Sequence, residues 1–189
     1  MTQTSQEKRP KKSVALSGVT AGTTALCTVG HSGNDLHYRG YDIKDLAENC
    51  EYEEVAHLLI HGHLPDPSEL AEYKENLRSM RGLPEQVKRV LEQVPAATHP
   101  MDVMPTGVSV LGCTLPERGD HNPVGPREIA DRLIASLGSI LLYWYHYATN
   151  GRRIDLETDD DCIGGQFLAL LLATKPPEEW TFIGYDPVL

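Results

Sequence analysis

The sequence predicts an all-α domain with a small β-hairpin near its N-terminus. From residue 53 onward, apolar residues recur at the three- and four-residue spacing of one helix face, and prolines or glycines stand at the segment ends. Only residues 25–41 combine β-favouring residues with a dense group of turn formers. With 189 residues, 40% of them hydrophobic and 23% charged, the chain can bury a core and has an ordinary globular composition.

The hairpin is expected to consist of two short strands joined by one turn. Residues 25–29 (ALCTV) and 36–41 (LHYRGY) are rich in strand-forming residues, whereas residues 30–35 (GHSGND) favour a turn. Six helices should follow, each with its apolar residues on one face. Their expected ranges are 53–61, 67–80, 84–94, 100–112, 126–148 and 162–173.

Capping residues and prolines mark the ends of the early helices. Asp66 can cap the second helix, and Pro67 suits its first turn. Pro84 opens the third helix and Pro95 ends it, after which Pro100 starts the fourth.

Pro105 lies inside the expected fourth helix, where a proline is unfavourable. A proline there removes the hydrogen bond to the carbonyl of Met101 and costs about 3 kcal/mol. The helix is therefore either kinked at this residue or begins after it.

The longest helix is expected from Pro126 to about Ala148, before a stop signal at Asn150 and Gly151. Its first half is amphipathic. Residues 140–147 (ILLYWYHY) are apolar or aromatic on every side, which predicts burial all round or contact with a partner.

Charge and cysteine content exclude several classes of function. The net charge of −10 argues against a nucleic-acid partner held through its phosphates. Residues 1–12, with four cations and one acid, are expected to form a basic disordered tail. No apolar run approaches the roughly 20 residues that cross a bilayer, so we expect no membrane partner. Four cysteines without a C-x-x-C pair indicate reduced thiols and a cytoplasmic location.

Three histidines near the end of the first helix are candidate metal ligands. His57 and His61 are one helical turn apart and His63 follows, but no acid or third ligand stands at a familiar zinc spacing. We interpret them as residues that cap and satisfy the helix end.

The acids at 159–161 can be interpreted as a cation site or as the start of the last helix, where negative charge is favourable. We favour the helix start. His146 is expected to be a core or interface histidine with a satisfied hydrogen-bond partner. No metal and no cofactor is predicted, and residue spacing alone gives no complete active site.

Longer strings are more specific than these single residues. They are KKSVALSGV at 11–19, SGNDLHYRGYDI at 32–43, EVAHLLIHG at 54–62, HPMDVM at 99–104, YWYHY at 143–147, and TDDD at 158–161 with IGG at 163–165. Together they resemble the citrate synthase family and, within it, the bacterial 2-methylcitrate synthase branch. The resemblance runs from about residue 11 to residue 180.

The resemblance implies that residues 13–180 form an incomplete helical large domain of a dimeric enzyme, followed by an unrelated tail at 181–189. Such enzymes condense an acyl-CoA with oxaloacetate: propionyl-CoA in this branch, acetyl-CoA in the citrate branch. An Asp abstracts a proton α to the thioester, one His stabilises the enol, and another protonates the oxaloacetate carbonyl. Family helices matching 100–112 and 127–147 line the dimer contact, so we expect self-association there.

The catalytic residues of the family have no match in this chain. The family places its catalytic histidines in GPxHGG and GxGHxxY strings and an oxaloacetate-binding His in HExNAST, and none of the eight histidines here has those flanks. The chain is therefore expected to be truncated, without catalytic residues, and inactive by itself. Relatives carry Arg where this chain has Pro105.

One substrate ligand can be transferred from the family. Arg81, in RGLP at 81–84, matches an Arg-x-Leu-Pro string whose Arg contacts the dicarboxylate substrate, and its forked donors suit a carboxylate. The alternative is a surface arginine at a helix end. Arg39 and Asp102 have no role that we can assign.

Three functions are consistent with the sequence. The first is part of a 2-methylcitrate synthase, and the second is a fragment of a citrate synthase that uses acetyl-CoA. The third is a non-catalytic interaction protein that associates with an intact synthase subunit.

Overall fold

The computed structural model describes residues 22–30, 36–115 and 125–172. These residues form three short strands and seven helices, so the predicted fold class is confirmed. The elements are β1 (Cys27–Val29), β2 (Leu36–Tyr38), β3 (Tyr41–Asp42), α1 (Ile43–Asn49), α2 (Tyr52–His61), α3 (Pro67–Ser79), α4 (Glu85–Leu91), α5 (Pro100–Thr114), α6 (Pro126–Asn150) and α7 (Ile163–Leu171). The predicted tails at 1–12 and 181–189 lie outside the described residues.

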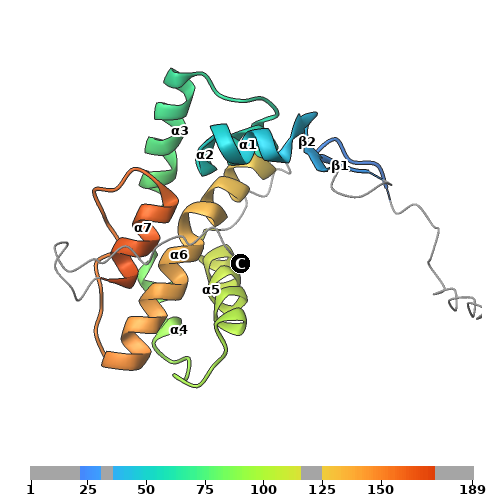
Figure 1. The fold of residues 1–189 in the computed structure, drawn as a ribbon. Coiled ribbons are helices and arrows are strands. Elements are labelled where there is room, and N and C mark those ends of the chain that lie inside the picture. Colours follow the sequence, from blue (N-terminus) through green and yellow to red (C-terminus); the bar gives the residue numbers. More distant parts are fainter. Residues whose placement is uncertain (1–21, 31–35, 116–124, 173–189) are drawn as a thin grey trace, which may run out of the picture.

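The strands form an antiparallel sheet in the order β1-β2-β3, which lies at one side of the helical body (Figure 1). The prediction of a continuous second strand at 36–41 was wrong, because a tight turn divides it. Arg39 and Gly40 have φ angles of 46° and 93°, and Tyr38 pairs with Tyr41 across them. Two successive positive φ angles are typical of the two-residue turn that matches the twist of a hairpin.

Helix α1 was given no range of its own in the sequence prediction, which expected helix in general after residue 43. Asp42 caps it, because the carboxylate accepts a hydrogen bond from the backbone N of Lys44 at 2.8 Å. Leu46 is the one buried residue in this helix of seven residues, so no apolar stripe marks it. The turn beside it is held to α2, where Arg39 Nη2 donates to the carbonyl of Leu59 at 2.8 Å. A cation suits such a helix C-terminus.

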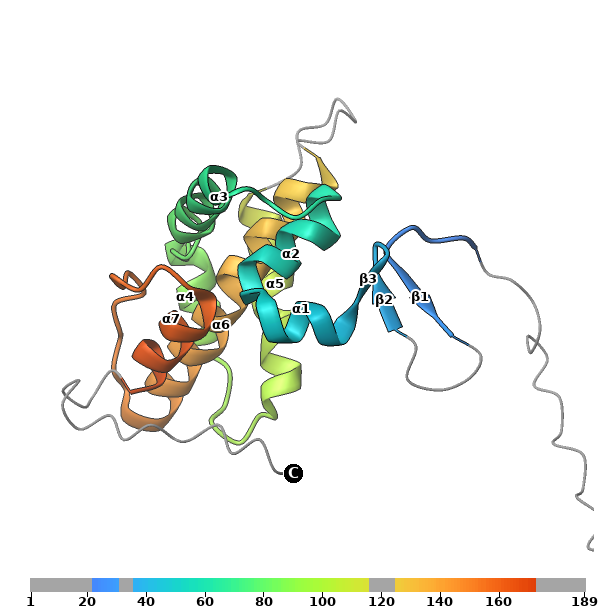
Figure 2. The same cartoon turned by 45° about the horizontal axis from the view of Figure 1, so that its top comes forward.

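Helix α6 is the central element of the helical body. It contacts α2, α3, α4, α5 and α7, and Figures 1 and 2 show it running between α5 and α7. The prediction of burial all round at residues 140–147 is confirmed in part: Leu141 and Tyr147 are half-buried, and Tyr145 is 43% exposed. The main core consists of Leu83, Val87, Leu91, Val103, Leu111, Ile140, Leu142, Tyr143, Trp144, Ile154, Leu156 and Leu170. None of the helices in the described ranges has the length and apolarity that a bilayer span requires.

Helix α5 begins at Pro100 and includes Pro105, so the structure favours the range that starts at Pro100 over a start after Pro105. His99 caps it, with Nδ1 accepting a hydrogen bond from the backbone N of Met101 at 3.2 Å. Further along, α5 approaches α6 closely. A Cβ atom added at Gly107 would lie 2.4 Å from Cγ2 of Ile140, so this glycine allows the two helices to pack at their present distance.

Candidate functional site

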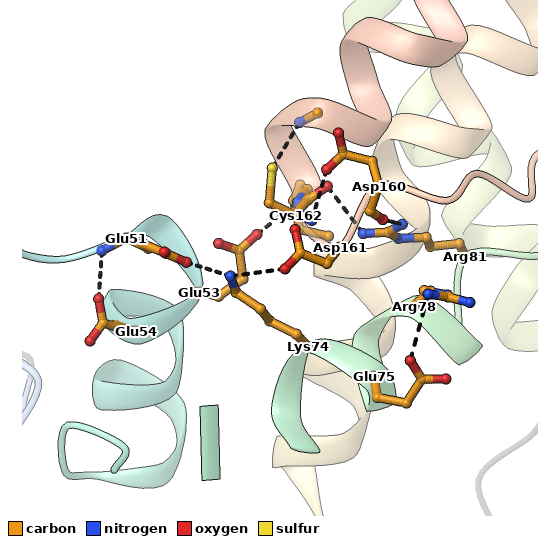
Figure 3. A network of polar contacts seen from close by, with 12 residues as sticks. Glu51, Glu53, Glu54, Lys74, Glu75, Arg78, Arg81, Asp160, Asp161 and Cys162 are labelled. Atoms are coloured by element: carbon orange, nitrogen blue, oxygen red, sulfur yellow. Dashed lines mark hydrogen bonds and ion pairs between the residues drawn. The ribbon is translucent and has the colours of Figure 1, made fainter. Parts of the chain in front are cut away.

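A polar network joins the loop before α7 to α2 and α3 (Figure 3). We call residues 158–162 the strap. The strap follows Leu156, which is buried in the main core, and leads into α7 at Ile163. Arg81 after α3 and Lys74 on α3 hold it, and Glu53 on α2 binds Ile163 directly after it.

Arg81, the predicted substrate ligand, lies behind the strap and is 1% exposed. Nη1 donates to the carbonyl of Asp160 at 2.5 Å and to Oγ1 of Thr158 at 3.4 Å, and Nη2 donates to the carbonyl of Cys162 at 3.1 Å. Nε is buried and has no hydrogen-bond partner in the described part of the chain. Burial lowers the pKa of the guanidinium, while the nearby Asp160 charge opposes this. The alternative of a surface arginine is wrong because this side chain is enclosed.

Lys74 holds the strap from the solvent side. Its Nζ lies 2.5 Å from Oε2 of Glu51 and 3.4 Å from Oδ2 of Asp161. The hydrogen bond with Glu51 raises the pKa of Lys74; burial opposes this, and Asp161 adds to the rise. Both carboxylates are largely exposed, so solvent screens these pairs and each contributes no more than about 1 kcal/mol.

Glu53 caps α7 from a neighbouring helix. Its side chain is buried, and Oε1 accepts a hydrogen bond from the backbone N of Ile163 at 2.7 Å. Within the same turn, Cys162 Sγ accepts from the backbone N of Gly165 at 3.1 Å, and Asp160 Oδ1 accepts from the backbone N of Cys162 at 3.0 Å. These acceptors satisfy N–H groups that a helix start leaves free. The acids at 159–161 therefore precede a helix, as the sequence predicts.

A cleft of about 380 Å³ lies beside Arg81. Its lining comes from two segments, residues 75–82 and residues 157–159. Arg78 lies in this lining and pairs with Glu75 at 3.9 Å. Glu157 and Asp159 also lie in the lining and supply carboxylates, so the cleft carries both signs of charge.

The three histidines considered as metal ligands bond to other groups of the protein. His57 Nδ1 lies 3.0 Å from the carbonyl of His63, and His63 Nε2 lies 3.3 Å from Oε1 of Glu69. His61 Nε2 lies 3.1 Å from a carboxylate oxygen of Asp131. The rings of His57 and His61 stack with centroids 4.5 Å apart, so they face each other rather than a shared point.

Asp131 was not anticipated as a structural residue. It is buried on α6, and besides His61 it accepts a hydrogen bond from the hydroxyl of Tyr73 on α3 at 2.7 Å. Burial raises the pKa of Tyr73, and the hydrogen bond to Asp131 adds to the rise. This cluster connects α2, α3 and α6.

Two other predicted site residues have definite surroundings. The possible ligand atoms of Asp160, Asp161 and Cys162 lie within 4.8 Å of one another, but Lys74 and Arg81 already contact this group and their positive charges disfavour a cation. His146 is buried, and Nε2 lies 2.8 Å from the carbonyl of Leu170. Its Nδ1 has no partner among the residues that the structure describes, so only one of the two ring nitrogens has the predicted hydrogen-bond partner.

Solved structures with this helical arrangement are citrate synthases. The enzyme from Thermotoga maritima matches with a TM-score of 0.68 and 26% identity, covering 87% of this chain and 42% of that chain. Citrate synthase from Thermoplasma acidophilum matches with a TM-score of 0.73 and 22% identity, covering 82% of this chain and 41% of that chain. The fold is therefore the all-helical fold of citrate synthases.

Sequence comparison gives the family directly. The family model described as the C-terminal domain of citrate synthase matches residues 15–183. The chain belongs to the citrate synthase family, which confirms the predicted resemblance. A 2-methylcitrate synthase from Shewanella oneidensis is 54% identical over 161 residues, which are 85% of this chain and 42% of that protein. The chain thus spans less than half the length of the proteins that it matches.

Proposed function

We propose that this chain supplies helices of the large domain of a 2-methylcitrate synthase. The reaction condenses propionyl-CoA with oxaloacetate and water, giving 2-methylcitrate and CoA in the catabolism of propionate. The observation that carries this proposal is the 54% identity over 161 residues to the Shewanella oneidensis protein. The four free thiols fit a cytoplasmic enzyme.

In this proposal Arg81 contacts one carboxylate of oxaloacetate. A guanidinium offers two parallel donors that match the two oxygens of a carboxylate, and its charge is fixed. Arg81 lies beside the cleft of about 380 Å³, which supports this role. The Thermoplasma acidophilum structure is a ternary complex with carboxymethyl-CoA and oxaloacetate, so this fold accommodates both classes of ligand.

The chain by itself is expected to show no turnover. None of its histidines has the flanks of the family's catalytic or oxaloacetate-binding histidines, and removing one acid or base alone commonly costs two to four powers of ten in rate. The measurement is release of the free CoA thiol from propionyl-CoA and oxaloacetate by the purified chain. Arg81→Ala is purified in parallel to detect contaminating host synthase. Turnover that disappears in Arg81→Ala would contradict the expected inactivity, whereas equal traces in both preparations point to the host enzyme.

A citrate synthase that uses acetyl-CoA is the second candidate. Its support is the structural match to the Thermotoga maritima citrate synthase at 26% identity. The same thiol assay distinguishes the two candidates when a longer chain that joins these residues to the family's catalytic histidine strings is supplied with each thioester. A larger kcat/KM for acetyl-CoA than for propionyl-CoA would replace the first proposal by the second.

We also propose self-association through α5 and α6. The exposed face of α5 includes Met101, which is 62% exposed, together with Pro105, Ser109 and Gly112, and the helix has a single charged residue, Asp102. An exposed helix face so poor in charge is typical of a contact surface. A third possible function, binding to an intact synthase subunit without catalysis, uses the same face.

Size-exclusion chromatography tests this contact. The chain should elute as a dimer or larger oligomer, and Ser109→Arg should shift it toward the monomer because a charge would be buried. Asn76→Arg, which adds the same charge to the exposed side of α3, is the matched control and should not change the elution volume. A monomeric chain that melts cooperatively would refute the contact.

A further inference from the structure

Arg81 cannot meet a ligand in the arrangement that the structure describes. Nη1 and Nη2 together donate to three acceptors, and all three belong to the strap: Thr158 Oγ1 and the carbonyls of Asp160 and Cys162. Nε has no acceptor within the described residues, but it is buried and out of reach of solvent. The residue as a whole is 1% exposed, although it borders the cleft.

We propose that the strap occupies the carboxylate-binding fork of Arg81, so that a dicarboxylate binds only when the strap moves away. The inference rests on the role proposed above for Arg81 and specifies how that role is regulated. A ligand carboxylate replaces neutral carbonyl acceptors on the guanidinium, and hydrogen bonds between two charged groups are stronger than those with one charged partner. Replacing the strap carbonyls by a carboxylate therefore strengthens the hydrogen bonds of Arg81. The opposing free energy is that of releasing the strap.

The contacts that oppose this release are distributed around the strap. On the solvent side, Asp161 is joined to Lys74 by an ion pair of 3.4 Å that is largely exposed. On the inner side, Glu53 holds the backbone N of Ile163 at 2.7 Å. The exposed pair is weak and solvent-screened, whereas the buried hydrogen bond keeps α7 in place. Apart from its hydrogen bonds to Arg81, the strap is thus held firmly next to α7, where Glu53 binds Ile163, and only weakly at Asp161.

The cleft is the route by which a ligand reaches Arg81 and the strap. It is lined by residues 75–82, including Arg81, and by residues 157–159, including Thr158 at the start of the strap, whose Oγ1 accepts a hydrogen bond from Arg81. A ligand that enters the cleft lies between the arginine and the start of the strap. Binding and strap displacement are therefore coupled, and the apparent affinity is lowered by the fraction of molecules in which the strap is closed.

Loosening the strap without touching Arg81 tests the coupling. Lys74→Met removes the cation that pairs with Asp161, while Lys44→Met makes the same change at an exposed position on α1. Oxaloacetate is titrated into the full chain by calorimetry, with Arg81→Lys as the variant that should lose binding. We expect Lys74→Met to lower Kd by about two- to fivefold, the range that a screened ion pair allows, and Lys44→Met to leave Kd unchanged.

Hydrogen exchange of the unsubstituted chain gives an independent readout. Saturating oxaloacetate should speed exchange at the amide of Cys162, which bonds to Asp160 in the strap, and should leave the α6 core amides unchanged. Binding with slowed or unaltered exchange at Cys162, or an equal Kd in Lys74→Met and Lys44→Met, would overturn the strap inference alone. Absence of oxaloacetate binding in the parent and in Lys74→Met would overturn the role of Arg81 and the inference with it.

Discussion

Replacing Gly107 by alanine should destabilise the protein through a single contact between α5 and α6. The added Cβ would lie 2.4 Å from Cγ2 of Ile140 and 3.3 Å from its Cγ1 and Cδ1. Ile140 is fully buried, and a β-branched side chain in a helix has one strongly preferred rotamer. Because Ile140 cannot turn away, the two helices must separate.

The magnitude follows from two opposing effects. Inserting one methyl group into a well-packed helix contact typically costs about 1–3 kcal/mol. Exchanging glycine for alanine inside a helix returns about 1 kcal/mol of propensity. The net loss is therefore about 0–2 kcal/mol, equivalent to a decrease in Tm of at most about 8 °C for a chain of this size.

Gly112 is the matched control on the same helix. A Cβ added there would have no atom of the described residues within 4 Å, so in the monomer, where the proposed contact face of α5 is free, Gly112→Ala should raise stability by about 1 kcal/mol through helix propensity. Both variants are compared with the parent by thermal and urea denaturation followed by circular dichroism. In an Ile140→Ala background, the Gly107 substitution should lose its penalty because the clashing methyl is gone. If Gly107→Ala stabilises the parent as Gly112→Ala does, the proposed close contact is wrong.

Two further substitutions test other parts of the fold. Pro105→Arg should raise stability by up to about 3 kcal/mol, because it restores the hydrogen bond to the Met101 carbonyl in the interior of α5; an unchanged Tm would show that residues 100–105 are not helical in solution. Burial raises the pKa of both Tyr73 and Tyr143 above the ordinary value of 10.0. Their contribution to stability is therefore complete below pH 10. It is lost as the pH rises further, because these tyrosines then ionise in the unfolded chain and not in the folded one. The loss of Tm between pH 9 and pH 11 should be smaller in Tyr73→Phe/Tyr143→Phe than in the parent, and parallel curves would contradict this.

Much of the helical fold could be predicted from the sequence, because apolar spacing and proline positions are local signals. The start of α3 at Pro67, with Asp66 as its cap, matches the prediction at the residue level. Helix α1 was given no range of its own because Leu46 is its one buried residue, and a single apolar position defines no period. The turn at Arg39 was missed because arginine rarely adopts positive φ, so its residue type gave no turn signal.

The candidate site could be predicted only in part. Arg81 was identified by resemblance, and its role as a substrate ligand is a proposal. No periodicity or capping signal in the sequence indicates that its side chain is buried behind the strap. The contacts of Glu53 with Ile163 and of Lys74 with the strap carry no local signal, because the partners are far apart along the chain. Asp131 likewise lies within an ordinary amphipathic helix, and only the packing of α2 and α3 against α6 brings His61 and Tyr73 to it.

The long sequence separation between the strap and its anchors has a consequence for the order of folding. Helices α4, α5 and α6 pack against their neighbours along the chain, whereas Arg81 and Asp160 are 79 residues apart and Glu53 and Ile163 are 110 residues apart. Contacts that close long loops pay the larger entropic cost before any stabilisation is gained, so they form late. We therefore expect a folding transition state in which α4, α5 and α6 are packed while Arg81 is still hydrated. Substitutions at Lys74 should then change the unfolding rate and leave the folding rate almost unaltered.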